Sequence, residues 1–104
     1  MKNLQELAKR FEEQKIQYAY GNFQEEVNPP HAVALETETT NFFAENKVYH
    51  RVGNIQLDIT MNYIDLNLIN TIENKILYDV CWNKSEMTYL SDEKIWQISY
   101  FFEI

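Results

Sequence analysis

The chain has 104 residues, the length of one domain, and 45% of them are hydrophobic, enough for a core without disulfide or metal support. Sixteen acidic against nine basic residues give a formal net charge of −7, which argues against a protein that tracks nucleic-acid phosphates with Lys and Arg. The single cysteine, Cys81, excludes an internal disulfide and fits a reducing compartment.

The sequence contains no segment typical of export or membrane insertion. Residues 1–6 lack the continuous apolar stretch of a signal peptide. The longest purely apolar runs are a few residues, whereas a membrane-spanning helix needs about 18 or more. We therefore expect a protein that is made in the cytoplasm and stays there at first.

The N-terminal segment predicts an amphipathic helix from about Leu4 to Gln14. Its apolar residues are Leu4, Leu7, Ala8 and Phe11. They follow the i, i+3, i+4, i+7 spacing of one helix face. Asn3 is suited to cap the first turn, and Glu6 three residues later completes a weak capping box, so we expect the helix to begin at Leu4.

Two strands are predicted next, on either side of a loop. Ile16, Tyr18 and Tyr20 alternate with other residues, which indicates a short strand. Residues 25–30 form a loop, because the two prolines at its end cannot continue a helix. A second strand follows over residues 31–38, with two small residues on one face that let another element approach closely. These are Ala32 and Ala34, and the opposite face carries Val33 and Leu35.

The clearest strand signal covers residues 54–62, whose apolar positions are Ile55, Leu57, Ile59 and Met61. Their alternation with polar residues is typical of a strand with one buried and one solvated face. Upstream, Val48, His50 and Val52 alternate in the opposite phase, and Gly53 stands at the change of phase. Gly53 is therefore a hairpin turn or a bulge in one long strand. We favour the bulge, because the order Gly-Asn lacks the more diagnostic Asn-Gly.

The second half of the chain predicts another helix and then strands. Helical spacing returns over residues 66–77, and Asp65 is suited to cap this helix. Short strands are predicted over residues 80–84 and 88–90. The last strand, 95–104, places Trp96, Ile98, Tyr100, Phe102 and Ile104 on one face. This order of elements favours one α+β domain, residues 1–104, with two helices packed on one face of a mostly antiparallel sheet.

Residue types that serve catalysis or metal binding are scattered. His31, His50 and Cys81 are far apart in the sequence, and none has a paired spacing such as CxxC or HxxxH. The neighbours of Cys81, Val80 and Trp82, predict a strand rather than an activated thiol. Adjacent acidic residues are typical of a solvated surface, and there is no glycine-rich phosphate loop. We therefore expect no enzyme activity, no cofactor and no metal.

Two adjacent phenylalanines, Phe42 and Phe43, occupy a polar, threonine-rich connection between predicted strands. Exposed apolar surface of this size usually marks a contact site. The alternative is a loop that folds back and buries one or both rings. We favour a loop that contacts a neighbouring subunit or partner and becomes ordered when covered. The candidate interface residues are Asn41, Phe42, Phe43, Glu45, Asn46, Lys47, Val48 and Tyr49.

The run NFFAENKVY at residues 41–49 is the most specific part of a wider similarity. Further matching segments are 18–23, 30–35, 52–60, the helix led by Asp65, and 92–97. Together they resemble small proteins of the head–tail module of long-tailed phages and prophages of Gram-positive bacteria. Within that module the chain is similar to tail terminators, also called tail-completion or tail-to-head joining proteins.

This resemblance implies a structural virion protein that caps the growing tail tube as a ring, commonly a hexamer, and docks onto the head connector. The implied partners are further copies of itself, the major tail protein and connector or neck proteins. DNA would only pass through the lumen, and no membrane is involved. The implied location is the host cytoplasm during assembly and then the tail or neck of the virion. The alternatives are another neck or head-completion protein and, from a different class, a small bacterial ligand-binding domain.

Overall fold

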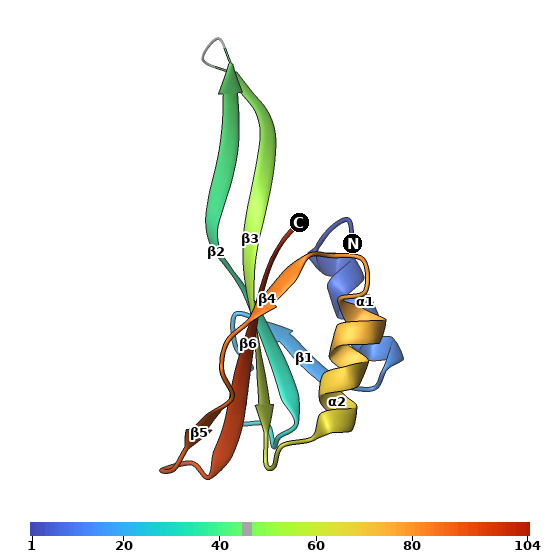
Figure 1. Ribbon diagram of the computed structural model, residues 1–104, viewed down its shortest axis with the longest axis vertical. Coiled ribbons are helices and arrows are strands. Elements are labelled where there is room, and N and C mark those ends of the chain that lie inside the picture. Colours follow the sequence, from blue (N-terminus) through green and yellow to red (C-terminus); the bar gives the residue numbers. More distant parts are fainter. Residues whose placement is uncertain (45–46) are drawn as a thin grey trace.

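The computed structural model describes residues 1–44 and 47–104, and between residues 38 and 52 it describes the backbone course without the side chains. The molecule is elongated, with extents of 51 × 28 × 27 Å along its principal axes. Its radius of gyration of 15.0 Å exceeds the roughly 13 Å expected for a compact domain of this length. Figure 1 shows the reason, a two-stranded ribbon that projects from the rest of the molecule. We call residues 40–44 and 47–52 the arm and the other described residues the body.

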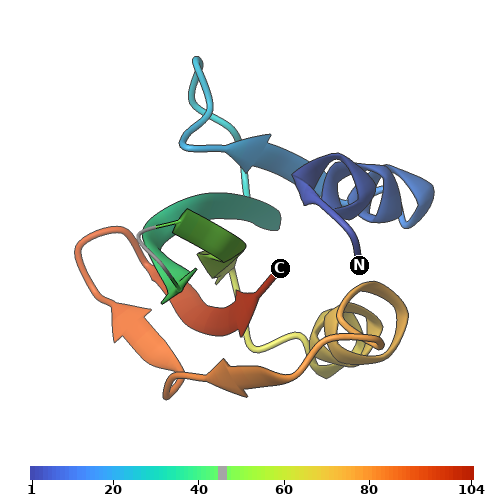
Figure 2. The same cartoon turned by 90° about the horizontal axis from the view of Figure 1, so that it is seen from above.

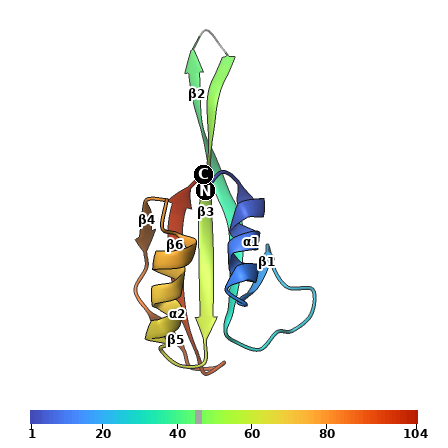
Figure 3. The ribbon, with the colours of Figure 1, turned by 90° about the vertical axis from the view of Figure 1, so that its right-hand side faces the viewer.

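Helices cover one face of a mostly antiparallel sheet, which confirms the α+β prediction. The elements are α1 (Leu4–Glu13), β1 (Gln17–Tyr20), β2 (His31–Ala44), β3 (Lys47–Met61), α2 (Leu66–Thr71), η1 (Ile72–Ile76), β4 (Trp82–Lys84), β5 (Thr88–Leu90) and β6 (Ile95–Glu103). The strand order is β1-β2-β3-β6-β4, with β5 also paired to β6; β1 is parallel to β2, and the other described pairs are antiparallel. Figures 2 and 3 show α1 and α2 side by side on the same face. No helix in the described residues is both long enough and apolar enough to cross a membrane.

The core lies between the helices and the covered face of the sheet. The predicted alternation is confirmed by the buried residues of β3 and β6, which are Ile55, Leu57, Ile59, Met61, Ile98, Tyr100 and Phe102. On β2, Ala32 and Ala34 are fully buried in the same cluster, whereas Leu35 on the opposite face is 48% exposed. The small side chains of β2 therefore face the core, and this is where the sheet and the helix layer meet.

Hydrogen bonds define both ends of α1. Asn3 Oδ1 accepts a bond from the Glu6 N–H at 2.9 Å, as the sequence predicted. At the other end, Lys15 adopts a left-handed conformation with φ of 59°. The N–H of Ile16 donates to the carbonyl of Phe11, five residues earlier, at 3.0 Å. This is the pattern of a Schellman motif, which ends the helix and directs the chain into β1.

The second helix begins as predicted and then changes its hydrogen-bond pattern. Asp65 caps α2 by accepting a bond from the Leu68 N–H at 3.1 Å. From Ile72 to Ile76 the chain is a π-helix, and the Leu77 N–H donates to the Ile72 carbonyl at 2.9 Å. The wider turn brings Ile72, Ile76 and Leu77 onto one face, where all three are fully buried.

Gly53 is neither a hairpin turn nor a bulge. β3 is one continuous strand, as we favoured, but Gly53 pairs with Thr39 and exchanges two backbone hydrogen bonds of 2.9 Å with Ile104. The irregular position in this region is Thr37 of β2, which lies between two paired glutamates and has no opposite residue. The change of phase in the sequence therefore lies where β3 passes from its pairing with β6 into the arm.

Candidate subunit interface

The predicted interface segment forms the outer part of a β-hairpin. Of the candidate residues, β2 contains Asn41, Phe42 and Phe43, β3 contains Lys47, Val48 and Tyr49, and Glu45 and Asn46 lie outside the described residues. Five backbone pairs run from Thr40↔Val52 to Ala44↔Lys47, a ribbon of roughly 15 Å. The side chains of Phe42 and Phe43 are not described, so their exposure stays a prediction.

The prediction of a loop for this segment was wrong. Its polar and threonine-rich composition suggested a connection, but Thr, Val, Tyr and Phe are all residues that favour strands. A strand alternates clearly between apolar and polar residues only where one of its faces is buried. In Figure 1 the arm extends away from the body, so a ribbon there has no core to impose that alternation.

The arm has no third strand beside it within the described residues. β6 follows β3 only as far as the pair Asn54↔Glu103 and the two hydrogen bonds between Gly53 and Ile104. Beyond Gly53 the two strands of the arm pair with each other alone. An isolated two-stranded hairpin is marginally stable in water, and its free edges can accept a further strand. The arm is therefore the part of this fold that gains most from a neighbour.

Polar contacts fix the base of the arm. The Thr37 hydroxyl donates to the Asn54 carbonyl at 3.3 Å, and the Glu36 N–H donates to the Tyr20 hydroxyl at 3.2 Å. Gly53 also exchanges two backbone hydrogen bonds of 2.9 Å with Ile104, the residue that follows β6. These contacts tie β1, β2, β3 and the end of β6 together where the arm leaves the body.

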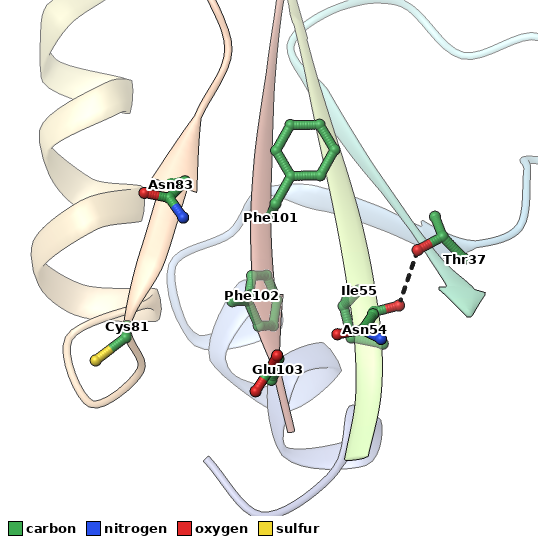
Figure 4. A pocket seen from close by; sticks show the side chains of 8 residues that line it. All are labelled: Thr37, Asn54, Ile55, Cys81, Asn83, Phe101, Phe102 and Glu103. Atoms are coloured by element: carbon green, nitrogen blue, oxygen red, sulfur yellow. Dashed lines mark hydrogen bonds between the residues drawn. The ribbon is translucent and has the colours of Figure 1, made fainter. Parts of the chain in front are cut away.

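A groove of about 560 Å³ lies beside this base, and Figure 4 shows the side chains that line it. They are Thr37, Asn54, Ile55, Cys81, Asn83, Phe101, Phe102 and Glu103. Phe101 is 42% exposed and projects from the face of β6 opposite the core. Cys81 is exposed and lies across β6 from Thr37. The groove thus combines an exposed aromatic ring with side-chain amides and one carboxylate.

A partly buried ion pair attaches the segment after η1 to α1. Arg10, 7% exposed, donates to both carboxylate oxygens of Asp79, at 2.7 and 2.9 Å, and to the Ile76 carbonyl at 2.7 Å. Its second partner is Glu6, at 2.8 Å, and the Met1 amino group also contacts Asp79. The hydrogen bonds from Arg10 hold the pKa of Asp79 well below its ordinary value. This pair ties η1 to α1 within the helix layer.

A second polar group links the buried face of β6 to η1. The Tyr100 hydroxyl donates to Glu73 at 2.6 Å, and Lys84 of β4 donates to the same carboxylate oxygen at 2.9 Å. Burial raises the pKa of the Glu73 carboxyl, but the bonds from Tyr100 and Lys84 outweigh it, and the net pKa is lowered. Burial and the bond to Glu73 raise the pKa of Tyr100. These groups brace the sheet behind the groove.

The residue types considered for catalysis do not come together in the described part of the molecule. Cys81 lines the groove, whereas His31 lines a separate depression beside Pro29 and Glu93. His31 Nδ1 is buried without a hydrogen-bond partner there, and burial lowers its pKa. The side chain of His50 lies outside the description. No group of three His, Cys, Asp or Glu among the described residues is arranged to hold a metal ion.

Sequence reasoning missed the groove beside the arm. The useful signal was Phe101, an aromatic residue at a position of β6 where the alternation places polar side chains. The partners of Phe101 across the strands, Gln56 and Asn83, are distant in the sequence and gave no sign of a common surface. The chain matches no protein-family model and no curated protein.

Proposed function

We propose that this protein is a structural subunit of a phage or prophage tail, which forms a ring, caps the tail tube and joins it to the head. The observation that carries the proposal is the arm, five backbone pairs that leave the body beyond Gly53 without a third strand. The arm carries the adjacent pair Phe42-Phe43, within the run that resembles tail terminators. An arm of this kind is suited to bind a neighbour rather than a small molecule.

The position of the arm is suited to a ring, although the same contact exchanged reciprocally between two copies would give a two-fold dimer. It lies at one end of an elongated molecule, so the surface that receives it belongs to another part of the neighbouring copy. Contacts between two different patches are heterologous, and they close into a ring when the rotation between copies permits. A ring is the form that can cap a tube.

The distribution of charge suits a ring through which DNA passes. Segment 38–52 carries two acidic and two basic residues, so the remaining fourteen acidic and seven basic residues account for the whole formal charge of −7. An acidic body repels the DNA phosphates, which favours sliding over binding. A nucleic-acid-binding subunit would need the opposite charge.

The experiment is to change Phe42 and Phe43 together to Ser. Both residues belong to the part of β2 that lies in the arm, and in Figure 1 the backbone of the arm extends away from the body. We therefore expect the free energy of unfolding of the monomer to change by less than about 1 kcal/mol. Ring formation, measured by mass photometry and negative-stain microscopy of concentrated protein, should be lost. In a phage or prophage that encodes the variant, heads and tails should accumulate unjoined.

The matched control changes Tyr63 and Ile64 together to Ser. They are also adjacent and apolar, are 66% and 45% exposed, and lie in the connection between β3 and α2, at the end of the body opposite the arm. This variant should still form rings. Suppose instead that the Phe42-Phe43 variant is largely unfolded and that its remaining folded fraction assembles normally. The side chains of Phe42 and Phe43 would then belong to the hydrophobic core of the monomer, and the proposal would fail.

A further inference from the structure

We infer that the groove beside the base of the arm is the receptor for the arm of a neighbouring copy. The inference rests on the proposed function, because it names the second patch that a heterologous ring requires. The first patch, the arm, leaves the body at Gly53, and the groove begins at the same level with Thr37 and Asn54. Each copy would donate its arm to one neighbour and receive the arm of the other.

The chemistry of the groove fits this occupant. Its exposed aromatic ring, Phe101, would pack against an apolar side chain of the incoming arm, such as Phe43 or Val48. The side-chain amide of Asn83 lies beside this ring, and an amide can both donate to and accept from a strand backbone. Extended chains bind to sheets mainly through main-chain hydrogen bonds, with alternate side chains in pockets beside the strands.

The charges of the two patches are complementary. The β3 half of the arm carries Lys47 and Arg51 and no acidic residue. The groove contributes the exposed carboxylate of Glu103, on a body that carries the whole net negative charge of the chain. Opposite charges orient the arm, while the apolar contacts supply most of the affinity.

A second exposed apolar surface is an alternative binding site for the arm. Tyr63, Ile64 and Leu66 are 66%, 45% and 67% exposed at the far end of the body. They line neither the groove nor the depression beside His31. The experiment must therefore decide whether the arm binds beside Phe101 or at this far end.

Thiol cross-linking distinguishes these two binding sites, because Cys81 lines the groove and is exposed. A second thiol is added near the end of the arm by Ala44→Cys. After mild oxidation or treatment with a short bismaleimide, this protein should give a ladder of covalent oligomers under denaturing conditions. The ladder should disappear when Cys81→Ser is added. A third variant, Ala44→Cys with Cys81→Ser and Leu66→Cys, places the receiving thiol at the far end and should give no ladder.

A ladder through Leu66→Cys but not through Cys81 would overturn the inference. Rings seen by microscopy without cross-linking to Cys81 would also overturn it and would leave the proposed function standing. A closed dimer linked by two bonds through Cys81 would support the groove as receptor and contradict the ring. Absence of any self-association would overturn both proposals.

A second measurement does not depend on the added thiols. Phe101→Thr keeps a residue suited to a strand and removes the ring from the groove. We expect this change to raise the protein concentration needed for assembly by about tenfold or more, as for the loss of a central interface residue. Tyr63→Ser should leave that concentration unchanged. If Phe101→Thr and Tyr63→Ser changed the concentration needed for assembly equally, the result would contradict the groove as the receptor of the arm.

Discussion

At the scale of single residues, Arg10 shows how a surface-type residue becomes part of the core. In the sequence it is one of a few isolated cations on an acidic protein. In the fold it is 7% exposed and binds Asp79, which is 69 positions away in the sequence. Removal of one partner from such a pair leaves a charge with too few hydrogen bonds. No periodicity in the sequence predicts this ion pair, because Arg10 and Asp79 become neighbours only when α1 and η1 pack together.

The first prediction concerns the acid stability that Asp79 contributes. Its folded-state pKa is lowered from 3.8 chiefly by the hydrogen bonds from Arg10. The unfolded state therefore binds the proton more readily, so this contribution is present above about pH 4 and is lost as the pH falls toward the folded-state pKa. We expect Asp79→Asn to lower the free energy of unfolding by about 1–2 kcal/mol at neutral pH, after allowance for partial exposure.

Denaturant unfolding between pH 7 and pH 2 measures this effect. The curves of the wild type and of Asp79→Asn should converge as the pH falls, because the protonated carboxyl resembles the amide. Asp92→Asn, at an exposed acid in the turn before β6, is the matched control and should run parallel to the wild type. A constant difference between wild type and Asp79→Asn at all pH values would mean that the pair contributes packing rather than charge.

At the scale of secondary-structure elements, the end of α1 carries a local conflict. Lys15 occupies the left-handed position of the Schellman motif, with φ of 59°. Glycine adopts this conformation without the strain that a Cβ introduces. The lysine side chain is exposed, so nothing in the core demands it. The position is thus a test of backbone conformation that leaves packing unchanged.

The second prediction is that Lys15→Gly stabilises the protein by about 0.5–1 kcal/mol, because it relieves this strain. Lys9→Gly is the control, at an exposed position inside the same helix, and should destabilise by about 1 kcal/mol. Both changes remove one positive charge, so the difference between them isolates backbone conformation. Thermal and denaturant unfolding give both values. A loss of stability in both variants would mean that Lys15 makes a contact of its own.

The elements differ in how far the sequence predicted them. The alternation from Ile55 to Met61 was decisive because one face of β3 is buried along its whole length in the body. The cap at Asp65 was predictable because capping depends on residues three positions apart. The β3 half of the arm was predicted as part of one long strand, but its β2 half was wrongly predicted as a loop, because residues 39–44 show no alternation of apolar and polar side chains. The groove was not predictable, because it joins residues from β2, β3, β6 and the segment before β4.

At the scale of the whole molecule, the arm and the body are separable in energetic terms. Among the described residues, the two strands of the arm pair only with each other, and Figure 1 shows their backbone extending away from the body. The sheet of the body closes at Gly53, where Thr39 lies on one side and Ile104 on the other. We therefore expect the body to fold without the arm, and we expect the arm, an isolated two-stranded hairpin, to gain stability when a neighbour covers it. Selection for assembly is a sufficient reason for such a division.

The last prediction follows from that division. Thr39 and Gly53 are directly opposite, so residues 40–52 can be replaced by the two-residue turn Asn-Gly. We expect the shortened protein to keep its free energy of unfolding or to gain about 1–2 kcal/mol, since a shorter connection costs less closure entropy. Sedimentation should show a monomer at concentrations where the full chain assembles. A loss of several kcal/mol would mean that the arm folds onto the body as part of its core. Unchanged assembly would place the interface elsewhere, with Tyr63, Ile64 and Leu66 as the first surface to test.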